Sequence, residues 1–286
     1  MLLEVRNLEK RYPGFTLDRV SFSLESGYIM GFIGRNGAGK STTMKSMLNL
    51  VHADGGAVGI DGLRFSEQER ACKQKIGYVS GAFECYQKSQ LRAIAEVTKQ
   101  FYDEWDDAAY RRYLQLFSLD ERKKVSELSA GMRVKFAIAL ALSHHAKLLI
   151  LDEPTSGLDP VSRNELLDVF QSVIEDGACS IFYSTHIISD LEKCADFITY
   201  IRNGKILAST DLDTFRAGYL LVSGEPERLD AAKPYLIGCK RHAFGFTGLI
   251  HAADADQFAD CKTAPADLES IMVYTEQEDA HEEAAC

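Results

Sequence analysis

Eight consecutive residues, Gly-Arg-Asn-Gly-Ala-Gly-Lys-Ser, have the spacing of a phosphate-binding loop. They span Gly34–Ser41 and fit the pattern G-x-x-x-x-G-K-[ST]. Glycines let backbone N–H groups wrap around a phosphate, and a helix that begins here adds positive potential. Lys40 can reach the β- and γ-phosphates of a nucleoside triphosphate, and the Ser41 hydroxyl can ligate Mg²⁺. The alternative is a chance glycine-rich turn, which matches this pattern in roughly 1% of chains of this length.

Two carboxylates follow a second apolar segment. Leu148–Leu151 leads directly into Asp152 and Glu153. At the carboxyl edge of a parallel sheet, these side chains would lie beside the phosphate loop. Asp152 would hold Mg²⁺, directly or through water, and Glu153 would orient and deprotonate an attacking water. Without a phosphate loop, a strand that ends in Asp-Glu has about even odds of being structural.

Other candidate residues have weaker signals when each is taken alone. Leu128–Met132 opens an apolar helix, and Ser129 is also what an ordinary helix N-cap would be. His186 follows a short apolar strand, where a lone histidine is usually structural. His144 and His145 lie in a connection between a helix and a strand, and we interpret both as structural.

The elements that must position these residues alternate along the chain, and their order predicts a layered α/β fold with a largely parallel sheet. Alternating apolar residues over 1–27 predict antiparallel strands, and 57–80 is expected to form a strand, a turn at Asp61-Gly62 and a second strand. Helical periodicity predicts a helical insertion over 91–143. Buried strands are expected at 28–33, 76–79, 147–151 and 181–185, and helices from about Ser41 and over 161–174.

The character of the chain changes after about Leu212. Short segments punctuated by Gly and Pro predict a small α/β appendage over 213–275. The last segment, 276–286, has five acidic and no basic residues between Glu276 and Glu283. Such a composition predicts a solvated, mobile tail.

Composition excludes several classes of function. The formal net charge of −10 disfavours nucleic acid as the main partner, because such binding depends on clustered Lys and Arg. The seven cysteines are scattered without a CxxC pair, which predicts reduced thiols in a cytosolic protein rather than a metal site. The sequence shows no secretory signal and no apolar run near 18 residues, so any membrane spans are expected from another chain.

Taken together and in order, the motifs resemble the ATP-binding cassette of ABC transporters. The resemblance covers about residues 1–212. It implies a P-loop NTPase core with a parallel sheet, an antiparallel β subdomain, a helical insertion at about 85–145 and a small C-terminal α/β appendage. The motifs that carry it are Gly34–Ser41, Leu128–Met132, Leu148–Glu153, Ser156–Asp159 and His186.

The resemblance also implies a role for individual residues. Tyr12 would stack on adenine beside Val20, and His186 would act as a switch at the γ-phosphate together with Lys40 and Glu153. Ser129 and Gly131 would meet the nucleotide of a partner subunit, and Asp159 would lie at the dimer seam. The implied ligands are ATP and Mg²⁺, with the metal at Ser41 and Asp152. The implied phosphate-binding residues are Asn36, Gly37, Ala38, Gly39, Lys40, Ser41 and Thr42.

Two positions depart from the family pattern. Ala130 and Met132 replace the usual Gly and Gln of the signature motif, but Ser129 keeps its hydroxyl. Gly81 stands where the family has a glutamine that touches Mg²⁺ and the membrane partner. Either a neighbour such as Glu84 or Gln87 reaches the metal, or the metal keeps an extra water, as Mg²⁺ readily does.

Segments such as Phe101–Trp105 and Ile187–Glu192 resemble ATPase subunits of bacterial ABC-2 type exporters. That resemblance implies a cytoplasmic ATPase, peripheral on the inner face of the membrane, that pairs with a second cassette and with membrane permease subunits. The alternative is a soluble ABC ATPase that acts on ribosomes or DNA. A single phosphate loop, the lack of sustained heptads and the acidic charge disfavour that alternative.

Overall fold

The computed structural model describes residues 1–80 and 86–283. Contacts between Cα atoms divide the chain into a first unit, Met1–Ser209, and a second unit that begins at Thr210. The phosphate loop and both carboxylates belong to the first unit. No helix in the described part of the chain is long and apolar enough to cross a membrane.

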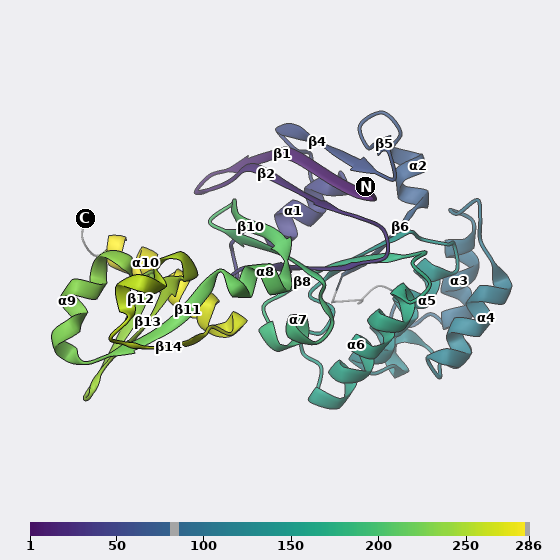
Figure 1. The fold of residues 1–286 in the computed structure, drawn as a ribbon. Helices are drawn as coiled ribbons and strands as arrows, with labels where there is room; N and C mark the ends of the chain where they lie inside the picture. The colour runs from purple at the N-terminus through teal and green to yellow at the C-terminus, as the bar shows by residue number, and fades with distance from the viewer. Residues whose placement is uncertain (81–85, 284–286) are drawn as a thin grey trace. The chain divides into compact units, whose positions relative to one another are not determined.

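A six-stranded sheet forms the centre of the first unit (Figure 1). Its strand order is β10-β9-β3-β8-β7-β6, and the pairs from β9 to β6 are parallel, which confirms the predicted parallel sheet. Every residue of β3 and β8 is buried, as expected for apolar strands covered on both faces. The bounds are β3 Ile29–Ile33, β6 Ile76–Ser80, β7 Leu148–Asp152, β8 Ser180–Thr185, β9 Phe197–Arg202 and β10 Lys205–Asp211.

The chain leaves three neighbouring strands at the same edge of this sheet and enters a helix each time. Helix α1 (Lys40–Met47) follows β3, α6 (Pro160–Ile174) follows β7, and α7 (Ile188–Cys194) follows β8. Because parallel strands end at one edge, the loops after β3, β7 and β8 lie side by side.

An antiparallel sheet with strand order β2-β1-β4-β5 forms a second layer. Helix α1 contacts β1 and β2 as well as β7 of the central sheet. Phe22 of β2 stacks on Phe182 of β8 with ring centroids 5.1 Å apart, so the two sheets share one hydrophobic core. The bounds are β1 Leu3–Tyr12, β2 Phe15–Leu24, β4 Gly55–Ile60 and β5 Leu63–Arg64, and α2 (Glu69–Gln74) follows β5.

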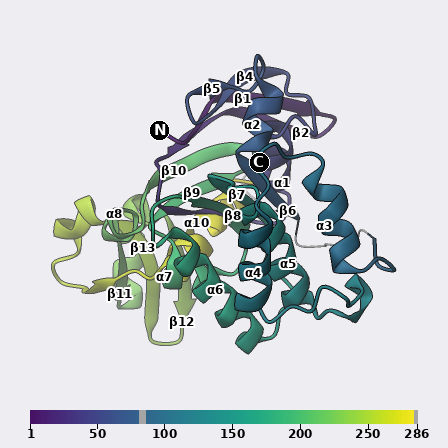
Figure 2. The ribbon, with the colours of Figure 1, turned by 90° about the vertical axis from the view of Figure 1, so that its right-hand side faces the viewer.

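Three helices and a short 3₁₀ turn form the predicted helical insertion (Figure 2). Helix α5 lies against α4 and against β6 of the central sheet. It approaches β6 closely at Gly77, where a Cβ would overlap the side chain of Ala141. The bounds are α3 Leu91–Lys99, α4 Asp107–Leu116, the 3₁₀ turn η1 Val125–Glu127 and α5 Ala130–Leu142.

The second unit is a four-stranded antiparallel sheet with strand order β12-β13-β11-β14. Helix α10 (Leu268–Glu283) packs against β12 and β13. The acidic segment that composition predicts to be a mobile tail is helical as far as Glu283, because it continues the helix that begins at Leu268. The other bounds are α8 Leu212–Ala217, β11 Tyr219–Gly224, η2 Pro226–Arg228, α9 Leu229–Ala232, η3 Lys233–Tyr235, β12 Gly238–His242, β13 Gly245–His251, η4 Ala252–Phe258 and β14 Lys262–Pro265.

Candidate nucleotide-binding and catalytic site

The loop between β3 and α1 has a backbone that only glycine adopts easily. Gly37 and Gly39 have left-handed φ angles of 87° and 114°. A Cβ at Gly39 would also lie 2.9 Å from the ring of Phe15. The loop is therefore free of side chains where its backbone curves, and this is the shape that lets N–H groups surround a phosphate.

Lys40 turns back over this loop instead of extending into solvent. Its side chain is only 6% exposed, and its ammonium donates a hydrogen bond to the Gly34 carbonyl at 2.7 Å. The same ammonium lies 3.4 Å from Oε1 of Glu153. The fold thus holds a positive charge between the phosphate loop and a carboxylate.

Asp152 at the end of β7 accepts hydrogen bonds from two hydroxyls. Ser41 Oγ donates to Asp152 Oδ1 at 3.2 Å, and Ser184 Oγ, from β8, donates to the same atom at 2.7 Å. Carboxylate and hydroxyl oxygens are the ligands that Mg²⁺ prefers, and here they lie beside the phosphate loop. The donor set of Ser41 and Asp152 therefore fits the ion that the sequence implies.

Glu153 and His186 come together from adjacent strand ends. Glu153 has a φ of +52°, so the chain turns sharply after β7. Its Oε2 lies 2.7 Å from Nδ1 of His186, which is 46% exposed. A carboxylate held between Lys40 and a partly exposed histidine can receive a proton from a water molecule in the adjoining pocket.

Lys40, Ser41, Glu153 and His186 line one pocket of about 450 Å³, and Asp152 lies behind Ser41 without lining it. It is lined by Phe15, Arg35, Asn36, Gly37, Gly39, Lys40, Ser41, Thr42, Glu153, Ser156 and His186. Of the predicted phosphate-binding residues, Ala38 alone does not line it. Ala38 is 6% exposed, and its carbonyl accepts a hydrogen bond from the Gly204 amide at 3.0 Å.

The structure corrects one predicted contact with the adenine ring of the nucleotide. Val20 is fully buried in the hydrophobic core and pairs with Leu8, so it cannot touch a ligand in the pocket. Phe15 lines the pocket instead. Tyr12 lies opposite Phe15 across the turn between β1 and β2 and is 42% exposed. The sequence analysis did not predict Phe15 as a site residue, although Phe15 is an aromatic residue only three positions after Tyr12.

The three residues predicted to meet a partner subunit also lie outside this pocket. Ser129 caps α5 by accepting a hydrogen bond from the Met132 amide at 3.2 Å, and Asp159 caps α6 through the amides of Val161 and Ser162. Hydrogen bonds from Ser162 hold the pKa of Asp159 below its usual value. Gly131 packs near the start of α6, where a Cβ would lie 3.6 Å from the Ser162 side chain. The starts of α5 and α6 are therefore neighbours, with Ser129 and Asp159 both exposed.

The position of the family glutamine lies outside the described residues, as Gly81 and Glu84 both do. Ser80, just before it, pairs with Asp152 across β6 and β7. Gln87 is described, and its carbonyl accepts a hydrogen bond from the Ser126 amide at 3.0 Å. This backbone contact ties the start of the helical insertion to η1.

Comparison with known proteins shows the family to which the chain belongs. The family described as ABC transporter matches residues 17–156. The bacitracin transport ATP-binding protein BcrA of Bacillus licheniformis is 31% identical over 215 residues, which are 74% of this chain and 70% of that protein. The lantibiotic transport ATP-binding protein SrtF of Streptococcus pyogenes is 35% identical over 215 residues, 74% of this chain and 92% of that protein. The linearmycin resistance ATP-binding protein LnrL of Bacillus subtilis is 34% identical over 220 residues, 74% of this chain and 70% of that protein.

Solved structures agree in fold. An ATP-binding subunit of an ABC transporter superposes with a TM-score of 0.68 at 30% identity, covering 76% of this chain and 92% of that one. A dimeric cassette, MJ0796 bound to ADP and phosphate, gives a TM-score of 0.61 at 21% identity, over 74% of this chain and 99% of that chain, and shows the fold alone. Because relatives above 30% identity match over more than two thirds of their own length, the chain belongs to the ATP-binding proteins of ABC transporters and is an ATPase.

Proposed function

We propose that this chain is the ATP-hydrolysing subunit of an exporter whose membrane spans are supplied by separate permease chains. It would work at the cytoplasmic face of the membrane. Relatives named for bacitracin transport, lantibiotic transport and linearmycin resistance support an export role. The observation that carries the proposal is the convergence of Lys40, Glu153 and His186 on the phosphate loop.

Each side chain has a separate task in hydrolysis. The loop amides and Lys40 would hold the β- and γ-phosphates of ATP. When Lys40 turns to a phosphate, it would release the Glu153 carboxylate, which His186 keeps in place at 2.7 Å. Glu153 would then orient a water molecule and accept its proton. Mg²⁺, held by Ser41 and Asp152, would neutralise charge on the phosphates.

A second cassette would complete the site. Ser129 and Asp159 are exposed and do not line the pocket of their own chain. Residues that cap neighbouring helices at an exposed surface are well placed to meet the nucleotide and the seam of a facing subunit. We therefore assign Ser129, Gly131 and Asp159 to contacts with a second cassette, either identical or related.

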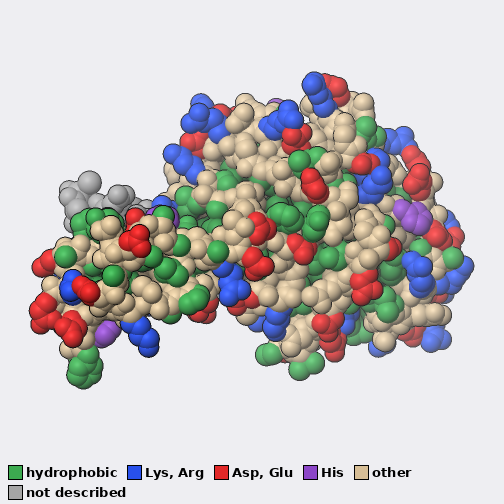
Figure 3. Space-filling view, viewed as in Figure 1, with side chains coloured by type: hydrophobic (Ala, Val, Ile, Leu, Met, Phe, Trp, Pro, Cys, Tyr) green, Lys and Arg blue, Asp and Glu red, His purple; other side chains and the backbone are tan. Residues whose placement is uncertain are grey.

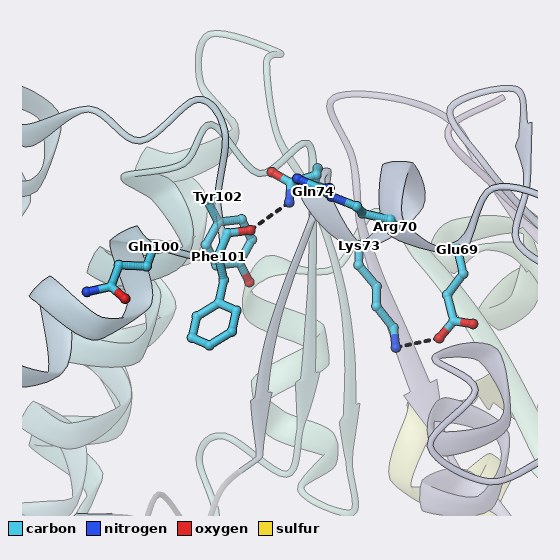
Figure 4. Close-up of a pocket in the computed structure, with 7 residues that line it drawn as sticks. All are labelled: Glu69, Arg70, Lys73, Gln74, Gln100, Phe101 and Tyr102. Carbon is cyan, nitrogen blue, oxygen red and sulfur yellow. Dashed lines mark hydrogen bonds and ion pairs between the residues drawn. The ribbon is translucent and has the colours of Figure 1, made fainter.

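The permease would dock beside the helical insertion. Two pockets meet at the end of α3, where Phe101 and Tyr102 line both of them. Figure 4 shows the side chains of Phe101 and Tyr102 on one side of the first pocket and α2, with Lys73 and Glu69, on the other. Tyr86 and Phe101 are each 69% exposed, which gives this surface an apolar character. Tyr86 and Ser89, in the described part of the segment that joins β6 to α3, line the second pocket, which supports a docking role for residues 81–90.

Surface charge gives no support to a nucleic-acid partner on the face drawn in Figure 3. Lys and Arg side chains are interspersed there with Asp and Glu. Binding to a phosphate backbone depends on clustered basic residues.

The substitution Glu153→Gln tests the proposal. An amide cannot accept the proton of the attacking water, so kcat should fall by about 10²–10⁴-fold. ATP binding should remain, and gel filtration with ATP and Mg²⁺ should show a stable dimer. Glu67→Gln is a matched control, because Glu67 is an exposed residue outside the pocket that pairs with Arg64. Turnover of Glu153→Gln equal to that of the control would remove Glu153 from the role of base.

A further inference from the structure

The buried hydroxyl of Ser184 contacts both Asp152, the proposed metal ligand, and Glu153, the proposed general base. Ser184 is the penultimate residue of β8, a strand that lies between β3 and β7 in the sheet. The residues before it, Ile181, Phe182 and Tyr183, are apolar or aromatic and fully buried. Ser184 is also fully buried. A hydroxyl in such a place is costly unless it is hydrogen-bonded, so its partners matter.

The first partner of Ser184 is the carboxylate of Asp152. The two residues pair across β7 and β8, and Ser184 Oγ donates to Oδ1 of Asp152 at 2.7 Å. Ser41 donates to the same oxygen at 3.2 Å. Among the described residues, none donates a hydrogen bond to the other oxygen, Oδ2. The Asp152 carboxylate is therefore held by one oxygen, and the other is left for the metal or its water.

The second partner of Ser184 is the backbone of Glu153. The Glu153 amide donates to Ser184 Oγ at 3.0 Å and also lies 3.2 Å from the Ser184 carbonyl oxygen. Glu153 has a left-handed φ of +52°, which costs a non-glycine residue energy. Both acceptors on Ser184 therefore anchor the turn that directs the Glu153 carboxylate toward His186.

We propose that Ser184 is a positioning residue that sets the geometry of the metal site and of the catalytic carboxylate through a single hydroxyl. When the Ser41 hydroxyl turns from Asp152 to Mg²⁺, Ser184 is the donor that keeps the Asp152 carboxylate in its orientation. The proposal rests on the roles assigned above to Asp152 and Glu153. It predicts that loss of this hydroxyl weakens the use of Mg²⁺ while binding of ATP without metal stays intact.

The test compares Ser184→Ala with Ser180→Ala. Ser180 is the first residue of the same strand and is equally buried, but its hydroxyl bonds to the Gly27 amide and the Glu25 carbonyl, away from the site. Both variants lose a buried hydrogen-bonding hydroxyl, so a general loss of stability affects both. A change specific to Mg²⁺ is expected only for Ser184→Ala.

Three quantities are measured for each purified chain: the Mg²⁺ concentration that gives half-maximal ATPase activity, kcat, and the affinity for ATP in EDTA and in Mg²⁺. For Ser184→Ala, the half-saturating Mg²⁺ should rise, kcat should fall, or both, by about 10–100-fold in total, which is typical when a residue that orients a metal ligand is lost. The affinity for ATP in EDTA should match wild type. Ser180→Ala should follow wild type in all three.

Ser184→Cys covers the case in which the alanine variant does not fold. The thiol fills nearly the same space but is a weak donor, so it should also raise the half-saturating Mg²⁺. Wild-type Mg²⁺ dependence and kcat in a folded Ser184 variant, or the same loss in Ser180→Ala, would overturn the inference. Absence of ATPase activity in the wild-type chain would instead refute the proposed function itself.

Discussion

Acid should destabilise this protein through one buried histidine, His144. Its side chain is 3% exposed, its ring stacks on Tyr102 with centroids 3.5 Å apart, and its Nδ1 lies 3.2 Å from the Gln74 carbonyl oxygen. Burial lowers the pKa of His144 from 6.5 to about 4. These contacts support the structural role that the sequence suggested for this histidine.

The sign of the effect follows from which state binds the proton. Between pH 6.5 and pH 4 the unfolded chain protonates His144, whereas the folded chain keeps the ring neutral. The stability that His144 contributes is therefore complete above pH 6.5 and is lost as the pH falls toward 4. The difference between the pKa values of His144 in the unfolded and folded chain corresponds to about 3 kcal/mol of unfolding free energy. About 2 kcal/mol of this stability is lost when the pH falls from 7 to 4.5.

The substitution His144→Phe isolates this contribution, because phenylalanine can stack on Tyr102 but does not titrate. Its free energy of unfolding should be lower than wild type at pH 7 by about 1 kcal/mol, since the Gln74 carbonyl loses a partner. On going to pH 4.5, wild type should lose about 2 kcal/mol more than the variant. Urea unfolding followed by fluorescence of Trp105, the single tryptophan, measures this for the first unit.

His145→Asn is the control for a histidine that is not buried. The His145 side chain is 56% exposed and its φ is +56°, a conformation that asparagine tolerates. This variant keeps the buried His144, so it should still lose stability as the pH falls from 7 to 4.5. If the free energy of unfolding of His144→Phe falls as much as that of wild type between pH 7 and pH 4.5, His144 is not the source of the acid sensitivity.

Two further predictions concern the nucleotide. Lys40→Ala should abolish ATP binding, measured by equilibrium titration, because the ammonium held over the loop is lost; unchanged affinity in a variant with a native circular dichroism spectrum would contradict its role. Tyr12→Ala should weaken ATP binding by about 1–3 kcal/mol, the range for base–aromatic stacking, whereas Tyr12→Phe should bind like wild type. Equal losses in the two Tyr12 variants would mean that the hydroxyl, not the ring, makes the contact.

The phosphate loop and the parallel sheet could be predicted from the sequence because both depend on residues close together along the chain. Glycines at fixed offsets from Lys40 and Ser41 require a side-chain-free loop, and the structure places Gly37 and Gly39 at left-handed φ angles. Apolar segments such as Ile29–Ile33 form strands buried on both faces, and their alternation with helices led to the parallel sheet. With that sheet, the carboxylates at the end of one strand necessarily approach the loop at the end of another.

Contacts between distant segments are what the sequence left open. The alternation of Val20, Phe22 and Leu24 with serines indicates a buried face of β2, but the position of Phe15 in the pocket follows from how β2 packs on the central sheet. The pairing of Ser184 with Asp152 follows from the register between β7 and β8, and the burial of His144 from the packing of Tyr102 and Gln74 around it. The spacing of residues along the chain determined which of them could take part in the chemistry. The tertiary structure decided which other side chains position those residues, because strand register and burial depend on segments far apart in the chain.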